Sequence, residues 1–227
     1  MKSHTPDKTR ILWLLVLVVV ACTPSKNATL DIGDGGLLTD GVCKAPCFWG
    51  IRPAITTEQE VAEVLKAKAV SEECETYNTE PESGPRGISC RHTLTISFRR
   101  GTNIVEDIAI RPTQTITIQE VITKYGRPDA VQVTSVGLPE RRPPQLVMII
   151  YFDSIKTRLH LPEQVGATYM VNPSTELVNI GYFDDSMYET LRQGAALRWR
   201  GYGNYPKDSH EPNGRYRNLD CPASRNP

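Results

Sequence analysis

The hydrophobic period of the chain changes from helical to strand-like after residue 65. Val61, Val64 and Leu65 recur at the spacing of one helix face. Apolar and polar residues then alternate from 94 to 98, and a second apolar stretch runs from 104 to 110 after a polar turn. This pattern predicts a helix followed by a β-hairpin.

The same change of period recurs about sixty residues later. Val121, Ile122 and Tyr125 form the apolar face of a second helix, which Gly126 and the proline two residues beyond it should end. Alternating or wholly apolar stretches follow and predict strands at 130–136, 146–152, 157–161 and 177–183. Residues 117–183 are therefore also predicted to form a helix followed by antiparallel strands.

Both predicted helices begin with the same capping sequence. Thr57 and Glu60 stand three residues apart, as do Thr117 and Glu120. In such a capping box the threonine hydroxyl accepts from the N–H of the glutamate, while the carboxylate accepts from the N–H of the threonine. We therefore interpret these glutamates as helix caps and not as catalytic carboxylates.

Helices followed by runs of strands predict an α+β fold, since a parallel α/β fold would alternate the two. We predict two related helix-plus-antiparallel-sheet units in tandem, at residues 42–112 and 113–197. A tail follows at 198–227, in which aromatic residues mix with arginine. We expect these aromatics to lie back over the domain, and contact with a glycan is the alternative.

The N-terminus has the pattern of an export signal. Lys2, Lys8 and Arg10 precede an apolar run at 11–21 that stops at Cys22. Eleven residues rise about 16 Å as a helix, roughly half the hydrocarbon thickness of a bilayer, so a permanent span is not expected. Residues 1–21 are therefore predicted to be a signal peptide.

The end of that run, from Val19 to Cys22, resembles the lipobox of bacterial lipoproteins. The resemblance implies that Cys22 takes a diacylglyceryl group and becomes the first residue after cleavage. We expect a protein held by lipid on the extracytoplasmic side of the cell membrane or outer membrane. Plain secretion remains open, because Val19 and Ala21 also suit an ordinary signal peptidase, and an uncleaved anchor is the third alternative.

Residues 22–41 are rich in glycine and small polar residues and are predicted to be a flexible tether. Cleavage would remove three basic residues and one acidic residue from totals of 26 each, which leaves the mature chain nearly neutral. A nucleic-acid partner would call for a basic surface and is not expected. The partners expected are the membrane, through the lipid, and a protein or other envelope component.

Five further cysteines suit an oxidising compartment. Cys74 and Cys90 bracket a polar stretch with prolines and glycines, and a disulfide there would close a loop and stabilise the fold by about 3 kcal/mol. A second bond is predicted from Cys221 to Cys47, with Cys43 as the alternative partner, which leaves one thiol over. The spacing of Cys43 and Cys47 differs from that of a thioredoxin-type redox motif and of the usual zinc sites.

A short pattern occurs around both helix starts: Thr-x-x-Glu-Val with a preceding glycine or a following Gly-x-Pro step. It comprises Gly50, Ile51, Thr57, Glu60 and Val61 in the first copy, and Thr117, Glu120, Val121, Gly126 and Pro128 in the second. The pattern resembles the small BamE-type (SmpA/OmlA) lipoproteins of outer-membrane assembly and, in tandem form, the β-lactamase inhibitor protein. Residues 46–53 are similar to a stretch of uncharacterised bacterial lipoproteins. The resemblance implies a binding or scaffolding module and identifies no ligand.

The sequence holds no known catalytic motif, and no cofactor or metal site is expected. Cys90 and His92 lie two apart and would share a strand face, but a disulfide suits Cys90 better than a nucleophile role. His160 should point away from the face of Leu159 and Leu161. Asp184 precedes a further helix, for which the spacing of Ser186 and Glu189 predicts a capping box; we interpret the acid as a favourable charge at its N-terminus.

These observations predict a non-enzymatic, lipid-anchored binding or scaffolding module of the cell envelope. The alternative is a secreted enzyme-inhibitor-like protein, whose inhibitory loop would be residues 137–144. An envelope hydrolase ranks third, and it would need a polar pocket around His92 or His160.

Overall fold

The computed structural model of the chain describes residues 30–39, 41–78, 86–136, 144–195 and 197–207. The predicted signal peptide, Cys22, Cys221 and residues 137–143 of the predicted inhibitory loop lie outside these ranges. Among the residues described, no helix is long and apolar enough to cross a membrane.

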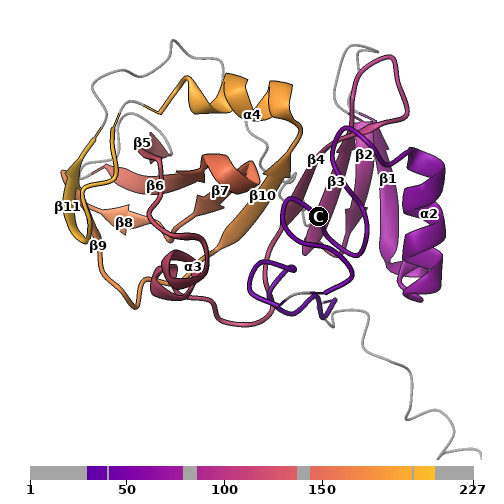
Figure 1. The fold of residues 1–227 in the computed structure, drawn as a ribbon, viewed down its shortest axis with the longest axis horizontal. Helices are drawn as coiled ribbons and strands as arrows, with labels where there is room; N and C mark the ends of the chain where they lie inside the picture. Colours follow the sequence, from indigo (N-terminus) through magenta and orange to yellow (C-terminus); the bar gives the residue numbers. More distant parts are fainter. Residues whose placement is uncertain (1–29, 40, 79–85, 137–143, 196, 208–227) are drawn as a thin grey trace, which may run out of the picture.

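One large antiparallel sheet forms the centre of the protein, in the order β1-β2-β3-β4-β10-β7-β6-β5, with β8 beside β6 (Figure 1). Its strands are β1 (Cys74–Asn78), β2 (Arg86–Cys90), β3 (Leu94–Phe98), β4 (Val105–Ile110), β5 (Ala130–Val136), β6 (Gln145–Phe152), β7 (Thr157–His160), β8 (Gln164–Val165) and β10 (Asn179–Phe183). A second sheet pairs β9 (Thr168–Val171) with β11 (Gly203–Pro206). The predicted α+β class is confirmed, and so are the predicted strands.

The hairpin of β1 and β2 was not predicted, because the stretch between Cys74 and Cys90 is polar and was interpreted as a loop. These strands pair in a regular antiparallel register that sets Cys74 opposite Cys90 and Thr76 opposite Ile88. The sequence of β2 shows no regular alternation of apolar and polar residues that would predict a strand. The hairpin extends the sheet by two strands beyond the predicted unit.

Three helices join the sheet: α2 (Glu58–Ala67), α3 (Ile118–Tyr125) and α4 (Asp185–Arg192), with short 3-10 turns η2 (Ser71–Glu73) and η3 (Asp153–Ile155). Both predicted capping boxes are present at the starts of α2 and α3. The capping box predicted at Ser186 is wrong, because Asp184 is the cap of α4 and its carboxylate accepts from the N–H of Met187 at 2.8 Å.

The two faces of the sheet are covered differently. Helices α2 and α3 pack on one face, where the apolar residues of alternate strand positions are buried; they include Val61, Leu65, Ile118, Val121, Leu94, Ile96, Ile108, Ile150 and Leu159. Helix α4 packs on the opposite face through Tyr188 and Leu191, against Tyr151 and Phe183. In Figure 1, α3 and α4 accordingly lie on opposite sides of the half formed by β5, β6, β7 and β10.

The N-terminal residues 30–39 lie on the α2 and α3 face and join the two halves of the sheet. Leu37 is fully buried. The hydroxyl of Tyr182 on β10 donates to the carbonyl of Gly35 at 3.1 Å. A Cβ on Gly35 would stand 2.9 Å from Ile110 of β4, so only glycine allows this close approach. The predicted flexible tether therefore does not extend over residues 30–39.

Asp34 holds the turn of this segment. Its carboxylate accepts from the N–H groups of Gly36 and Leu38, both at 2.9 Å, and from the N–H and hydroxyl of Thr39. Burial would raise the pKa of Asp34, but the hydrogen bonds from Thr39, Gly36 and Leu38 outweigh it and lower the pKa. The segment is thus fixed by polar contacts as well as by apolar burial.

The described part of the tail also packs against the domain. Trp199 and Tyr205 are buried and their rings stack with centroids 5.9 Å apart. The prediction that these aromatics lie back over the domain is confirmed for Trp199 and Tyr205, whereas Tyr202 is exposed. Their burial leaves these two rings little surface for a glycan.

Candidate functional site at the outer edge of the sheet

Strand β1 forms one end of the main sheet. It pairs with β2 along its whole length and, within the described ranges, with no other strand. The disulfide between Cys74 and Cys90 links the two strands and confirms the predicted pairing of these cysteines. Thr76 and Asn78 are exposed along this edge. An unpaired strand edge carries main-chain donors and acceptors that another chain can use.

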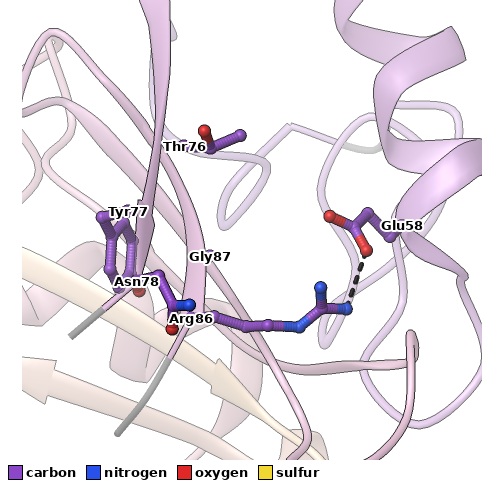
Figure 2. Close-up of a pocket in the computed structure, with 6 residues that line it drawn as sticks. All are labelled: Glu58, Thr76, Tyr77, Asn78, Arg86 and Gly87. Atoms are coloured by element: carbon purple, nitrogen blue, oxygen red, sulfur yellow. Dashed lines mark hydrogen bonds and ion pairs between the residues drawn. The ribbon is translucent and has the colours of Figure 1, made fainter. Parts of the chain in front are cut away.

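A pocket of about 280 Å3 lies beside this edge, between β1 and the start of α2 (Figure 2). Its lining consists of Glu58, Thr76, Tyr77, Asn78, Arg86 and Gly87. Glu58 comes from the first turn of α2, and the other residues come from the two strands of the β1 and β2 hairpin. The site therefore combines a strand edge, a helix start and a charged pair.

Several contacts hold the side chain of Arg86, which lines this pocket. Its Nη2 donates to a carboxylate oxygen of Glu58 and to Oδ1 of Asn103, both at 2.7 Å. Its guanidinium also lies over the ring of Phe98, 5.5 Å from the centroid. These contacts fix the guanidinium plane, so the remaining donors of Arg86 keep a constant direction.

Gly87 makes room for the aromatic ring of Tyr77. A Cβ at position 87 would stand 2.6 Å from the Tyr77 hydroxyl and 2.2 Å from the carbonyl oxygen of Ile96. The Tyr77 hydroxyl lies 3.2 Å from Oγ of Ser97 on β3. The side chain of Tyr77 is thus fixed to the face opposite α2, and β1 is tied to β3 as well as to β2.

Asp107 of β4 continues this polar chain on the same face of the sheet. Burial raises the pKa of Asp107 to about 6, although a hydrogen bond with Ser97 opposes the shift. Only 7 % of its surface is exposed. A buried carboxylate of this kind either serves a function or lowers the stability of the fold. Asp107 is not among the residues that line the pocket of Figure 2.

His160 shares a face of β7 with Arg158 and pairs laterally with Asn179 of β10. The prediction that it points away from the buried Leu159 and Leu161 is confirmed. Burial, together with the charge of Arg158, lowers the pKa of His160 to about 3, so the imidazole is neutral at physiological pH. Nε of Arg158 and Oδ1 of Asn179 are buried, and neither has a hydrogen-bond partner in the described structure.

His92 does not share a strand face with Cys90 as predicted. β2 ends at Cys90, and Arg91 and His92 form a turn with φ of 44° and 56°. Cys90 is bonded to Cys74 and is therefore no nucleophile. Across the described parts of the chain, no group of three or more His, Cys, Asp or Glu side chains is placed to bind a metal ion.

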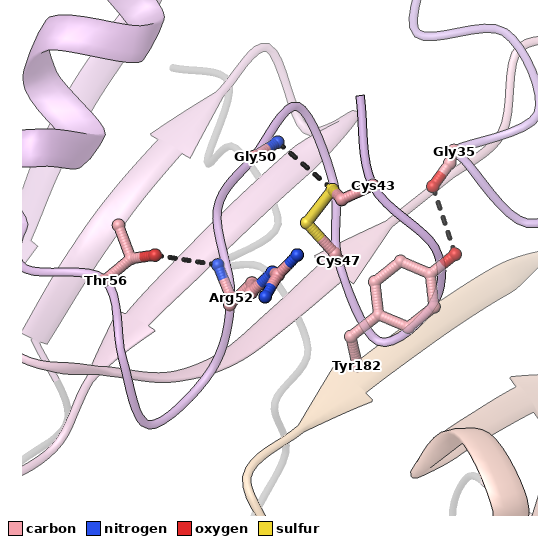
Figure 3. The surroundings of a disulfide bond; sticks show 7 residues. All are labelled: Gly35, Cys43, Cys47, Gly50, Arg52, Thr56 and Tyr182. Carbon is pink, nitrogen blue, oxygen red and sulfur yellow. Dashed lines mark hydrogen bonds between the residues drawn. A yellow bond between two sulfur atoms is a disulfide. The ribbon is translucent and has the colours of Figure 1, made fainter. Parts of the chain in front are cut away.

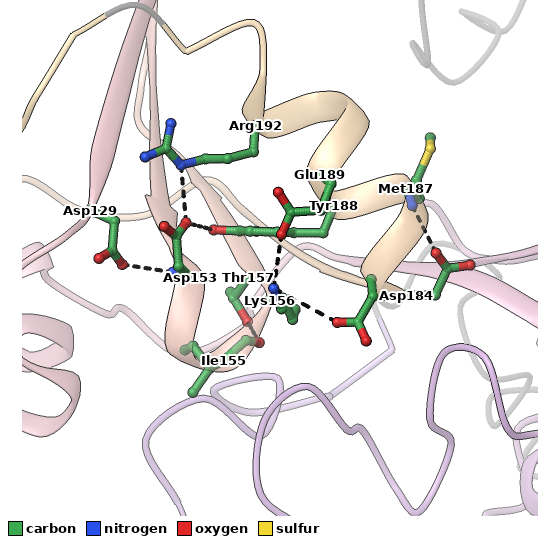
Figure 4. Close-up of polar contacts among 11 residues, drawn as sticks. Asp129, Asp153, Ile155, Lys156, Thr157, Asp184, Met187, Tyr188, Glu189 and Arg192 are labelled. Atoms are coloured by element: carbon green, nitrogen blue, oxygen red, sulfur yellow. Dashed lines mark hydrogen bonds and ion pairs between the residues drawn. The ribbon is translucent and has the colours of Figure 1, made fainter.

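A second polar cluster attaches α4 to the sheet (Figure 4). A carboxylate oxygen of Asp153 accepts from the hydroxyl of Tyr188 at 2.7 Å and from Nε of Arg192 at 3.0 Å. Lys156 donates to Glu189 at 3.0 Å, and its pKa is raised chiefly by this hydrogen bond. These groups are all paired between η3 and α4, so the cluster has a structural role.

The second disulfide joins Cys43 to Cys47, and the bond predicted from Cys47 to Cys221 is therefore wrong (Figure 3). The two Cα atoms are 5.8 Å apart because the chain turns within the five residues. The N–H of Gly50 donates to Sγ of Cys43 at 3.3 Å, and Cys47 is buried. The proline inside this short segment was the sequence signal for the turn.

Comparison of the chain with protein-family models, characterised proteins and solved structures finds no match. The resemblance to BamE-type lipoproteins and to the tandem inhibitor therefore stays a prediction. The candidate site is argued from the described residues alone.

Proposed function

We propose that the chain is a lipid-anchored extracytoplasmic protein that binds a protein or envelope partner and catalyses no reaction. The observation that carries this proposal is the edge of β1, which pairs with no further strand within the described ranges and has a pocket beside it, since such an edge can dock another chain. The two disulfides support the compartment, because they persist where the surroundings are oxidising.

We also propose that the domain consists of two related units, which meet where β4 pairs with β10. The strand order supports this: reading outward from that pair gives β4-β3-β2-β1 on one side and β10-β7-β6-β5 on the other. The helix starts support it as well. The N–H of Glu58 donates to Asn103 just before β4, at 2.7 Å, and the N–H of Ile118 donates to Thr175 just before β10, at 2.9 Å.

Metabolic labelling with a radioactive fatty acid tests the anchor. The wild-type protein should take up label and the Cys22→Ala variant should not, because the thiol of Cys22 is the proposed site of attachment. An unlabelled wild type would contradict the anchor, and so would equal labelling of the two. N-terminal sequencing of a secreted, unlabelled product would then establish plain secretion.

Crosslinking in native membranes, followed by mass spectrometry of the captured species, tests the binding role. The expected result is an envelope component enriched over a capture with an unrelated lipoprotein of similar abundance. The absence of any component enriched in this way would refute the proposed function. No feature of the described residues favours the inhibitor alternative.

A further inference from the structure

The main-chain groups on the outer side of β1 can be assigned from two contacts of Cys74. Its N–H donates to the carbonyl of Ser71, and its Cα lies 4.0 Å from that of Cys90. In an antiparallel ladder, so close an approach belongs to a pair that does not exchange hydrogen bonds. Because the pattern alternates, the N–H and C=O groups of Thr76 and Asn78 also point away from β2.

These outward groups have no partner in the parts of the chain that the structure describes, whereas part of the opposite end of the sheet is covered by the tail. There, the N–H of Val131 on β5 donates to the carbonyl of Leu197 at 2.9 Å, and the N–H of Leu197 donates back at 3.2 Å. β1 has neither proline nor a bulge to hinder pairing, and the disulfide at Cys74 links it to β2.

We propose that a partner protein adds an extended segment to the outer edge of β1, as a further strand of the main sheet. This inference rests on the proposed binding function and names its site and the class of its partner. Thr76 and Asn78 would each exchange two main-chain hydrogen bonds with the added strand. Such bonds provide affinity without regard to sequence, and a neighbouring pocket then selects the side chain.

The pocket beside β1 offers one acceptor and one set of donors. Figure 2 shows the carboxylate oxygen of Glu58 that is not bonded to Arg86 pointing toward Thr76, and Nη1 of Arg86 lies on the same side. The hydrogen bonds of Arg86 to Glu58, Thr102 and Asn103 all use Nη2. The ion pair of Glu58 and Arg86 carries no net charge. A carboxamide matches this arrangement, because its oxygen accepts from the guanidinium while its NH2 donates to the carboxylate.

The charges along the edge favour a different protein over a second copy of this chain. Glu75 and Glu72 are exposed there, and β1 contains no basic residue. A second copy paired edge to edge would bring carboxylates toward carboxylates, which destabilises a strand pair. The partner segment should therefore carry Asn or Gln at the pocket and Lys or Arg near Glu75.

The test uses the mature chain with Cys22→Ala, so that the protein is obtained without lipid, and a phage library of random linear peptides as the probe. Enriched peptides should contain Asn or Gln together with a basic residue. Amide hydrogen exchange should then show that a bound peptide protects the N–H groups of Thr76 and Asn78. Thr76→Pro removes one outward N–H and should weaken peptide binding about tenfold or more.

Two control variants make this result specific. Thr76→Ala keeps the outward N–H and should bind as the parent protein does. Glu58→Gln should weaken the peptides that contain a carboxamide about tenfold, whereas Glu63→Gln, an exposed position of α2 outside the pocket, should not. If Thr76→Pro fails to fold, amide hydrogen exchange of Thr76 and Asn78 in the parent protein, with and without peptide, tests strand addition instead.

Three results would overturn the proposal. One is a library that yields no binding peptide, and another is a bound peptide that leaves the exchange of Thr76 and Asn78 unchanged. The third is a sedimentation experiment showing a dimer in which these same amides are already protected. If crosslinking captures a partner while no linear peptide binds, the proposed function stands and strand addition fails. If peptides bind and crosslinking captures nothing, strand addition stands and the envelope role fails.

Discussion

Replacing Asp107 by asparagine should stabilise the protein at neutral and alkaline pH. The native state holds this carboxyl with a pKa of about 6, against 3.8 for an ordinary aspartate, because burial disfavours the charged form. A gap of about two units corresponds to about 3 kcal/mol of unfolding free energy at pH 8. The asparagine amide brings an additional N–H that lacks a partner, which costs about 1 kcal/mol. The net gain expected is about 2 kcal/mol.

The gain should depend on pH in a defined direction. Because the folded-state pKa of Asp107 is raised, the native wild type binds a proton that the unfolded chain does not between about pH 4 and pH 6. The contribution of this group to stability is therefore complete below pH 4 and is lost as the pH rises through 6. The difference between Asp107→Asn and the wild type should fall from about 2 kcal/mol at pH 8 to near zero or slightly negative at pH 4.

Urea unfolding followed by tryptophan fluorescence at pH 4, 6 and 8 measures this difference. Glu75→Gln, which changes an exposed carboxylate at the edge of the sheet, serves as the control and should shift the free energy by less than about 0.5 kcal/mol at each pH. The reasoning would be refuted if Asp107→Asn were less stable than the wild type at pH 8. It would also be refuted if the difference were the same at pH 8 and pH 4.

Three further variants test the packing. Leu37→Ala should lower the unfolding free energy by about 2–5 kcal/mol, because Leu37 is fully buried; a loss below 1 kcal/mol in urea unfolding would mean that this segment is not part of the core. Replacing Cys74 and Cys90 together by serine should cost about 3 kcal/mol, and non-reducing peptide mapping that finds both thiols free in the wild type would contradict the bond. Gly126→Ala should cost about 1–3 kcal/mol in thermal unfolding, since its φ is 84°, whereas Gly41→Ala, which meets nothing within 4 Å, should change little.

The helix starts were predictable because their chemistry is local. A threonine and a glutamate three residues apart suffice to specify a capping box, and both boxes occur where the sequence placed them. The strands of the sheet interior were predictable for a similar reason, since burial on one face imposes alternation. Strand β6, with nearly every residue apolar, was recognised as central and lies within the sheet.

The candidate site was not predictable, because edge strands need not alternate. β1 has one side turned to solvent, and its residues Glu75, Thr76 and Asn78 are exposed. A polar strand of this kind is stabilised by its ladder with β2 and by a disulfide, and neither is visible in the hydrophobic pattern. The cysteine spacing marked the position of the hairpin but was interpreted as the closure of a loop.

The role of residues 30–39 was missed for a different reason. Glycines there suggested flexibility, but Gly35 is required by the close approach of Ile110 and Ile180. The apolar residues Leu30, Ile32 and Leu37 were the available signal, and all three are buried. The pairing of β4 with β10 connects distant parts of the chain, and no local pattern indicates such a contact.

The contact between Gly35 and Tyr182 has a consequence for the order of events during synthesis. The two residues are 147 positions apart in the chain, so the segment at 30–39 is made long before the strand that receives it. Contacts of such separation form only after the intervening chain has been brought together. The segment can contact β4 and Thr113 earlier, but its contact with Tyr182 must wait until almost all of the sheet is translated. An exported chain would therefore complete its core only after β10 had crossed the membrane.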